Sequence, residues 1–288
     1  MTLPERPSRF VVSPDGTRTA VFTAGTGPPL LLVHGTTADH RTWRVVGPEL
    51  ARRWTIHAVD RRGRGDSGDA ATYAIERELD DIAAVAGELA ASAGLAIDVI
   101  GHSLGGRIAL GASLRSPAIG RIVAYESAPL APGEAALDPD LDARLRADLA
   151  AGDLDGMLAR FMTEAIGMPP ADLQAFRDNP IWPLRVAAAP TILRELEAAE
   201  HDSAVGLDAL ASVSVPVLQL CGALSPASFR LGAEALDRRL VRGELAIIDG
   251  ARHGGHHSHA GVFLALAEAF LRRPPAARAG QSGLPSTP

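Results

Sequence analysis

Short apolar runs alternate along the chain with longer segments of helical character. The short runs are rich in β-branched and other apolar residues, and glycine, proline or aspartate bounds most of them. They are Val21–Phe22, Leu30–Val33, Ile56–Val59, Ile97–Ile100, Ile122–Tyr125, Val217–Leu220 and Leu245–Ile248. The helical segments between them are Glu76–Ser92, Arg107–Leu114, Ser228–Leu240 and Val262–Leu271. Strands that alternate with helices predict an α/β fold with a mostly parallel, doubly wound sheet that helices cover on both faces.

The alternation stops between Ser127 and Ala211, where about 85 residues contain no convincing strand pattern. This stretch is rich in alanine and leucine, and prolines punctuate it. Three parts of it predict helices: Asp140–Ala150, Leu154–Ile166 and Thr191–Glu200. A connection of this length far exceeds an ordinary loop between two strands. We therefore interpret it as a helical cap inserted over the carboxyl edge of the sheet. The alternative is a set of extra helices on the side of the fold.

The predicted organisation has four parts. Residues 1–126 and 212–273 form the two halves of the core, and residues 127–211 form the cap. Residues 274–288 are rich in proline, glycine, alanine and serine, which predicts a disordered tail.

The composition supports a packed domain and excludes several kinds of chemistry. Hydrophobic residues make up 47% of the 288 positions and charged residues 22%, which suffices for a sizeable core. The net charge is 28 − 34 = −6 and no basic run is present, so we expect no nucleic-acid partner. All 28 basic residues are arginine. The absence of lysine excludes Schiff-base catalysis, pyridoxal-phosphate anchoring and a phosphate-binding loop that needs lysine.

Cys221 is the only cysteine, so the chain can form neither an internal disulfide nor a cysteine-cluster metal site. Its place in an apolar run predicts a buried, inert thiol. The N-terminus has no secretory signal pattern, and no apolar stretch approaches the roughly 20 residues of a membrane span. We expect a soluble, cytoplasmic protein with no membrane span. The sequence leaves the oligomeric state open.

A nucleophile is indicated by Gly101-His-Ser103-Leu-Gly105, which matches the pattern G-x-S-x-G. The pattern alone is weak, but here it follows a predicted strand directly and opens a predicted helix. This strand–turn–helix context is the one that a nucleophile elbow requires, and glycines beside the serine leave room for the sharp turn. We therefore predict that Ser103 is the nucleophile. The alternative is a glycine-rich turn with an incidental serine.

A serine hydroxyl needs a base, and the candidate histidines lie late in the chain. His253 follows the last predicted strand within a short loop, so it should lie at the same sheet edge as Ser103. His256, His257 and His259 lie at the start of the next helix and are expected to be polar surface or helix-terminal residues. The spacing of His257 and His259 would suit a metal, but no carboxylate accompanies them as in common zinc sites, and we predict no metal or cofactor.

Two backbone N–H groups are needed to stabilise an oxyanion. One should belong to Leu104, directly after the nucleophile. The other should come from the loop His34-Gly-Thr-Thr37 after an early strand, and Thr36 is the predicted donor. The alternative interpretation of His34 and Gly35 is an ordinary turn.

Four motifs together resemble the α/β-hydrolase superfamily over about 200 residues of the core. They are Leu32-Val-His-Gly-Thr36, Asp60-Arg-Arg-Gly-Arg-Gly-Asp-Ser-Gly68, Gly101-His-Ser-Leu-Gly-Gly106 and Gly250-Ala-Arg-His253. The resemblance implies an α/β-hydrolase fold with a serine nucleophile. The role of the second motif in the superfamily is mainly structural, so neither Asp60 nor Asp66 is predicted to be catalytic. The motifs are specific to the superfamily but to no substrate.

The chain departs from the superfamily at the position of the triad acid. In most members this acid follows the strand after the cap, where the present chain has Ser225. Some members, including certain haloalkane dehalogenases and lipases, carry the acid one strand beyond the nucleophile strand, and this chain has Glu126 there. Adjacent strands lie about 4.8 Å apart, so Glu126 can reach His253. The alternatives are a Ser–His dyad in which Glu126 only begins the cap, or Asp249 as the acid.

The resemblance predicts a serine hydrolase that cleaves a carboxylic ester or thioester of a small-molecule acyl substrate through an acyl-enzyme. Ser103 disfavours haloalkane dehalogenases and epoxide hydrolases, which need an aspartate at the elbow. The open alternatives are a carbon–carbon bond hydrolase, lyase or perhydrolase on the same fold, and a non-catalytic ligand receptor. Large apolar residues of the cap are predicted either to line the substrate pocket or to fill the core of the cap. They are Phe161, Met162, Met168, Phe176 and Trp182, and we assign substrate binding to Phe161, Met162 and Trp182.

Overall fold

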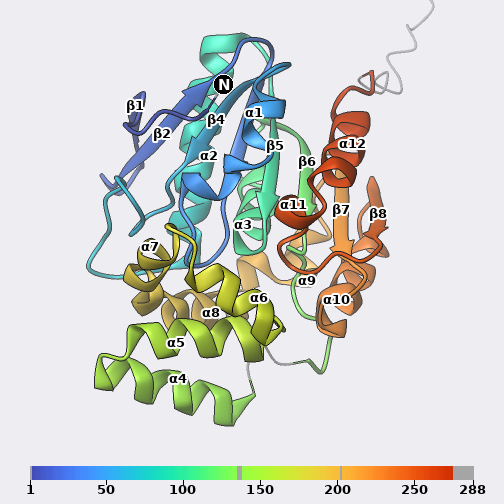
Figure 1. Cartoon of the computed structure of the whole chain (residues 1–288). Coiled ribbons are helices and arrows are strands. Elements are labelled where there is room, and N and C mark those ends of the chain that lie inside the picture. Colours follow the sequence, from blue (N-terminus) through green and yellow to red (C-terminus); the bar gives the residue numbers. More distant parts are fainter. Residues whose placement is uncertain (1, 135–137, 202, 275–288) are drawn as a thin grey trace, which may run out of the picture.

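The computed structural model describes residues 2–134, 138–201 and 203–274 (Figure 1). Within these residues eight strands form one sheet in the order β1-β2-β4-β3-β5-β6-β7-β8. The strands are β1 (Arg9–Val12), β2 (Arg18–Ala24), β3 (Pro29–Val33), β4 (Thr55–Val59), β5 (Ile97–His102), β6 (Ile119–Tyr125), β7 (Val217–Gly222) and β8 (Gly243–Ile248). From β4 to β8 all neighbours are parallel, whereas β1 and β2 pair antiparallel at one edge. The predicted mostly parallel α/β fold is thus confirmed.

Helices cover both faces of the sheet (Figure 1). Those of the core are α1 (Gly47–Leu50), α2 (Ile75–Ala93), α3 (Leu104–Ser113), α10 (Ala227–Asp237), α11 (Gly255–Ser258) and α12 (Ala260–Leu271), with the 3₁₀-helix η1 (His40–Arg44). Side chains along β3 alternate between the faces: Leu31 joins the apolar cluster with α2 and α3, and Leu30 and Leu32 join the cluster with α12. Because successive strand residues point to opposite faces, a continuous apolar run is what a doubly covered strand requires.

The described residues between Ser127 and Ala211 form helices and turns. They comprise α4 (Pro139–Ala151), α5 (Leu154–Arg160), α6 (Pro170–Arg177), α7 (Trp182–Ala187), α8 (Ile192–His201) and α9 (Leu207–Leu210), with the π-helix η2 (Phe161–Ala165) and the 3₁₀-helices η3 (Ala189–Thr191) and η4 (Ser203–Val205). A separate apolar cluster holds α4, α5 and α7 together. In contrast, Val205 and Leu210 pack into the cluster of α2 and α3. The predicted cap therefore ends in two short helices that pack on the core.

Some boundaries differ from the sequence expectation. Helix α3 begins at Leu104, directly after Ser103, and not at Arg107. Strand β1 had no predicted counterpart, because only Val11 of its four residues is buried and the pattern is too short to detect.

The predicted tail lies outside the described residues from 275 onward. No helix in the described part of the chain combines the length and hydropathy of a membrane span.

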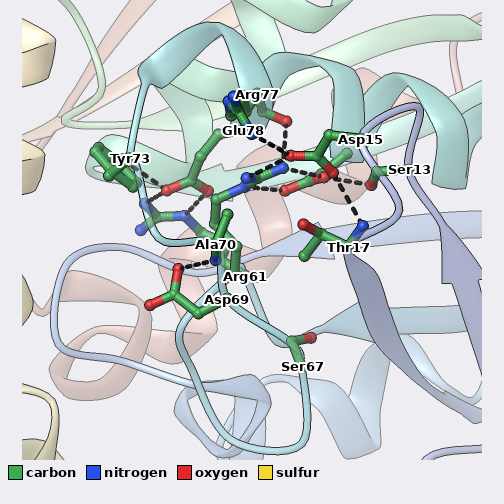
Figure 2. Close-up of polar contacts among 12 residues, drawn as sticks. Ser13, Asp15, Thr17, Arg61, Ser67, Asp69, Ala70, Tyr73, Arg77 and Glu78 are labelled. Carbon is green, nitrogen blue, oxygen red and sulfur yellow. Dashed lines mark hydrogen bonds and ion pairs between the residues drawn. The ribbon is translucent and has the colours of Figure 1, made fainter.

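A buried cluster of arginines and carboxylates joins the core to the cap. Arg61 follows β4, and its guanidinium contacts Glu78 of α2 at 2.5 Å and Glu195 of α8 at 3.0 Å. Arg64 also pairs with Glu195, and Tyr73 donates a hydrogen bond to Glu78 at 2.7 Å. Figure 2 shows Arg61, Glu78 and Tyr73 converging over α2. Burial would raise the pKa of Glu195, but Arg61 and Arg64 outweigh it and hold that pKa below its ordinary value.

The same loop is ordered by Asp60 and Arg62. Asp60 accepts hydrogen bonds from the backbone N–H of His40 and Asp66 and from Nδ1 of His40. Arg62 pairs with Asp81 of α2 at 2.7 Å. Side chains of the second sequence motif thus serve to fix the loop and to attach it to α2.

We predict that Glu78→Ala lowers the free energy of unfolding by about 3 kcal/mol, because it leaves the buried Arg61 with one of its two carboxylate partners missing. Urea unfolding followed by circular dichroism measures the change. Glu88→Ala on the exposed side of α2 is the matched control and should change stability by less than about 0.5 kcal/mol. Equal stabilities of the two variants would contradict the assigned role of the cluster.

Candidate active site

Ser103 occupies the single residue between β5 and α3. Its backbone has φ 54° and ψ −131°, a conformation that non-glycine residues rarely adopt. The strand before it, the helix after it and a hydrogen bond from its N–H to the carbonyl of Tyr125 at 2.8 Å hold it there. The turn therefore presents the side chain at the carboxyl edge of the sheet, at the start of a helix.

The glycines around Ser103 are required by close backbone contacts. A Cβ on Gly101 would lie 2.2 Å from Cα of Gly106, and one on Gly105 would lie 2.1 Å from the carbonyl oxygen of His34. A Cβ on Gly35 would approach Cβ of Ser103 to 2.9 Å. The loop after β3 thus packs directly on the turn that holds Ser103.

His253 lies in the loop after β8, and its Nδ1 is 2.6 Å from Oε2 of Glu126. Because a carboxylate can only accept, Nδ1 carries the proton and Nε2 is left to accept one. The other carboxylate oxygen of Glu126 accepts a hydrogen bond from the N–H of Gly222 at 2.7 Å. Glu126 is 3% exposed, and the ring of Phe229 stacks on the imidazole at 4.7 Å. The imidazole is therefore oriented on both its edge and its face.

Asp249 is the alternative acid, and Ser225 stands where most superfamily members carry the acid. Their placement differs from that of Glu126. Asp249 is exposed, whereas Nδ1 of His253 is taken by Glu126. Ser225 stands at the turn after β7, where its N–H donates to the carbonyl of Gly222.

Three non-glycine residues of the described chain have positive φ, and all three belong to this region. They are Thr37 at 61°, Ser103 at 54° and Glu126 at 48°. Such conformations cost of order 1–3 kcal/mol each and persist only where the surrounding structure imposes them. Their concentration at one sheet edge marks it as the candidate site.

The predicted oxyanion donors lie beside Ser103. Thr36 lines a cavity with Ser103 and His253, and Thr36, Ser103 and Leu104 together line the neighbouring one. The loop that carries Thr36 is fixed by His34, whose Nδ1 donates to the carbonyl of Gly35 at 2.8 Å and whose Nε2 accepts from the N–H of Arg61 at 3.0 Å. Burial lowers the pKa of His34 well below its ordinary value, which keeps it neutral in this role.

The cavity that contains Ser103 and His253 has a volume of about 470 Å³. Its apolar wall comes from the cap and comprises Phe161, Met162, Ile166, Met168 and Phe176. Trp182 is not among the described lining residues. It is buried in the cap cluster, donates a hydrogen bond to Asp155 at 2.6 Å and meets the ring of Phe176 edge-on. The structure thus places Phe161 and Met162 at the cavity and Trp182 behind it.

His102 and Phe229 contact His253 and were not singled out from the sequence. Nε2 of His102 donates to the backbone carbonyl of His253 at 2.9 Å, and burial lowers the pKa of His102 well below its ordinary value. The position of His102 directly before Ser103 in the sequence could have indicated a role at the site, whereas no motif near Phe229 indicated one. His256 is buried beside His102, and His257 and His259 line the cavity.

A further group of potential metal ligands in the described chain is formed by Asp39, His40 and Asp60. One carboxylate oxygen of Asp60 already accepts two hydrogen bonds from His40, and the other accepts from the N–H of Asp66. Asp39 pairs with Arg41 at 2.6 Å. These groups are engaged in ordering the loops after β3 and β4.

We predict that Gly105→Ala destabilises the protein by about 1–3 kcal/mol, because the new methyl group would meet backbone oxygens of the loop after β3. Gly87→Ala in α2 is the matched control, since nothing lies within 4 Å of a Cβ there. It should stabilise the helix by about 0.5–1 kcal/mol. Thermal and urea unfolding measure both changes, and a stabilising Gly105→Ala would contradict the close packing described.

Known proteins resemble this chain along most of its length. A family model described as the alpha/beta hydrolase family matches residues 30–266. A pimeloyl-[acyl-carrier protein] methyl ester esterase of Neisseria meningitidis is 32% identical over 262 residues, which cover 83% of this chain and 75% of that protein. The crystal structure of an alpha/beta hydrolase from Sphaerobacter thermophilus is 31% identical, with a TM-score of 0.76 over 91% of this chain and 100% of the other. An esterase from Exiguobacterium antarcticum shares the fold, with 21% identity and a TM-score of 0.75 over 92% of this chain and 99% of its own.

Proposed function

The chain belongs to the alpha/beta hydrolase family, and from that premise we propose that it is a serine esterase with Ser103, His253 and Glu126 as its catalytic triad. The observation that carries the proposal is the 2.6 Å hydrogen bond between Nδ1 of His253 and the buried carboxylate of Glu126. This bond fixes the tautomer in which Nε2 can act as a base.

In the proposed reaction Nε2 of His253 takes the proton of Ser103 while the serine oxygen attacks the ester carbonyl. The carbonyl electrons move onto oxygen, and the N–H groups of Thr36 and Leu104 stabilise this oxyanion. The carbonyl re-forms as the alkoxide leaves with the proton from His253, which gives an alcohol and an acyl-enzyme. Water then gives a proton to His253 and attacks the acyl group, and the released acid leaves as Ser103 regains its proton.

The position of the acid at the end of β6 is compatible with this mechanism. Strand β7 lies between β6 and β8, and the N–H of Gly222 at its end donates to Glu126. That hydrogen bond stabilises the charged carboxylate, which in turn stabilises the imidazolium formed during catalysis. A carboxylate after β7, where Ser225 stands, is therefore not needed.

The substrate is proposed to be an ester with a small or medium-sized acyl group, because the cavity of about 470 Å³ lies at the lower end of ligand pockets. Phe161 and Met162 would contact the acyl chain. The name of the meningococcal relative supports methyl esters as the first compounds to test. A thioester is the second class, since the same steps apply to it.

We expect a fluorophosphonate probe to add one label to the native protein, at Ser103. Intact mass and peptide mass spectrometry measure the label. The label should be absent from Ser103→Ala and from protein unfolded in urea, because reactivity depends on the base and the oxyanion donors. A folded protein that remains unlabelled would refute the proposed nucleophile.

We expect Glu126→Gln to lower kcat for a chromogenic ester by about 10²- to 10⁴-fold, because an amide cannot stabilise the imidazolium as a carboxylate does. Asp249→Asn is the matched control and should retain wild-type activity, since Asp249 is exposed. The reverse pattern would move the acid to Asp249, and full activity of Glu126→Gln alone would indicate a Ser–His dyad.

A further inference from the structure

The charged residues that line the catalytic cavity are predominantly cationic. Arg44, Arg185 and Arg252 line it, and Asp172 is the one carboxylate among the described lining residues. Asp172 is exposed to solvent. An uncharged ester needs no such arrangement, so the arginines require a separate explanation.

Arg185 reaches from α7 of the cap to the loop after β3. Its terminal nitrogens donate to the hydroxyl of Thr37 at 3.3 Å and to that of Thr42 at 3.2 Å. Its Nε is buried and has no hydrogen-bond partner in the described part of the chain. Thr37 follows Thr36 directly, so the guanidinium is held close to the proposed oxyanion donor.

Among the described residues no carboxylate lies within 4.0 Å of the Arg185 guanidinium. Asp39 favours its charged form from a distance, but that carboxylate already pairs with Arg41 at 2.6 Å. Burial lowers the pKa of Arg185 to about 10, so the side chain stays charged at neutral pH. The buried Arg61 and Arg62, in contrast, each pair with carboxylates. Arg185 is half-buried and its Nε is fully buried, and a charge withdrawn from water without a carboxylate partner is costly, so Arg185 is poised to bind an anion from outside the chain.

The other groups that face Arg185 leave its charge uncompensated. Burial, Arg44 and Arg185 together lower the pKa of His257 to about 3, and burial also lowers that of His256. Both imidazoles are therefore neutral at neutral pH. Their Nδ1 atoms are buried without partners among the described residues. The ring of Phe176 lies 5.8 Å from the Arg185 guanidinium carbon and contributes no net charge.

We propose that Arg185, assisted by Arg44, forms an anion subsite within the catalytic cavity, and that the natural substrate is an ester which also carries a carboxylate or phosphate group. The inference rests on the proposed function, since it assigns the substrate class of the same site. A planar guanidinium donates two hydrogen bonds to such an oxyanion, and the apolar wall of Phe161 and Met162 suits the chain between anion and ester.

The test compares esters that differ only in charge. Monomethyl adipate is paired with methyl hexanoate, and monomethyl succinate and suberate vary the distance between ester and carboxylate. Methyl 3-phosphonopropionate provides the phosphate-like arm. We expect the wild-type kcat/KM to be higher for an anionic ester than for its neutral counterpart. The anionic group, carboxylate or phosphonate, whose ester has the higher kcat/KM is the one that the subsite prefers.

Arg185→Gln should lower the ratio of kcat/KM for anionic over neutral ester by roughly 10- to 100-fold, mainly through KM, because it removes a charge-assisted hydrogen bond. Arg194→Gln is the matched control. Arg194 is also a cap arginine that contacts the core, through Asp69 at 2.8 Å, but it does not line the cavity. That variant should leave the ratio unchanged.

Two results would overturn the subsite. The first is a wild-type preference for the neutral ester. The second is an unchanged ratio in Arg185→Gln, and if both esters then lose activity equally, Arg185 is only a contact between cap and core. Arg44→Gln, at an exposed position, gives a second reading of the ratio if Arg185→Gln fails to fold. Hydrolysis of methyl hexanoate that is lost in Ser103→Ala would uphold the esterase in each case. Its absence, together with no hydrolysis of the anionic esters, would refute the esterase itself.

Discussion

The hydrogen bond between His253 and Glu126 is the interaction on which the rest of the site depends. It joins the loop after β8 to the end of β6 across the intervening β7, whose terminal N–H holds the second carboxylate oxygen. Two further contacts place the same loop: the Tyr125 hydroxyl donates to the carbonyl of Arg252 at 2.6 Å, and His102 donates to that of His253. His102, next to Ser103, and Tyr125, next to Glu126, therefore both position the loop that carries His253. A displacement of β6 against β5 would therefore disturb the relative positions of Ser103, Glu126 and His253 at once.

Parallel strands give this arrangement its geometry. The ends of β3, β5 and β6 lie side by side, and each is followed at once or within a few residues by a backbone with positive φ. A sharp turn at each end directs the next residues over the sheet edge, where Thr36, Ser103 and Glu126 meet. The conformational cost is local, whereas the restraint comes from strands whose side chains are almost fully buried. Rigidity of the sheet is thus what keeps unfavourable turns in place.

The sequence predicted the parts of the structure that have local patterns. The strands of the core and Ser103 follow from apolar runs and glycine spacing, and Glu126 emerged because Ser225 left no carboxylate after β7. Local patterns do not encode which distant surfaces meet. Trp182 is large and apolar, as a pocket-lining residue would be, but it packs inside the cap. Nothing in the sequence distinguishes Arg185 from the other arginines, and only the fold brings it against Thr37 and Thr42. Such positions depend on how the cap settles on the core, which periodicity does not specify.

The ion pairs of Glu195 restrict which part of the cap can move to admit a substrate to the cavity at Ser103. Since two buried guanidinium groups hold this carboxylate of α8, lifting that helix would break two buried ion pairs at once. The segment from α4 to α7 has its own apolar cluster and carries the residues that cover Ser103. Helix α8 is thus fixed to the core by ion pairs, and a route for the substrate to the cavity is expected on the side of α4 to α7.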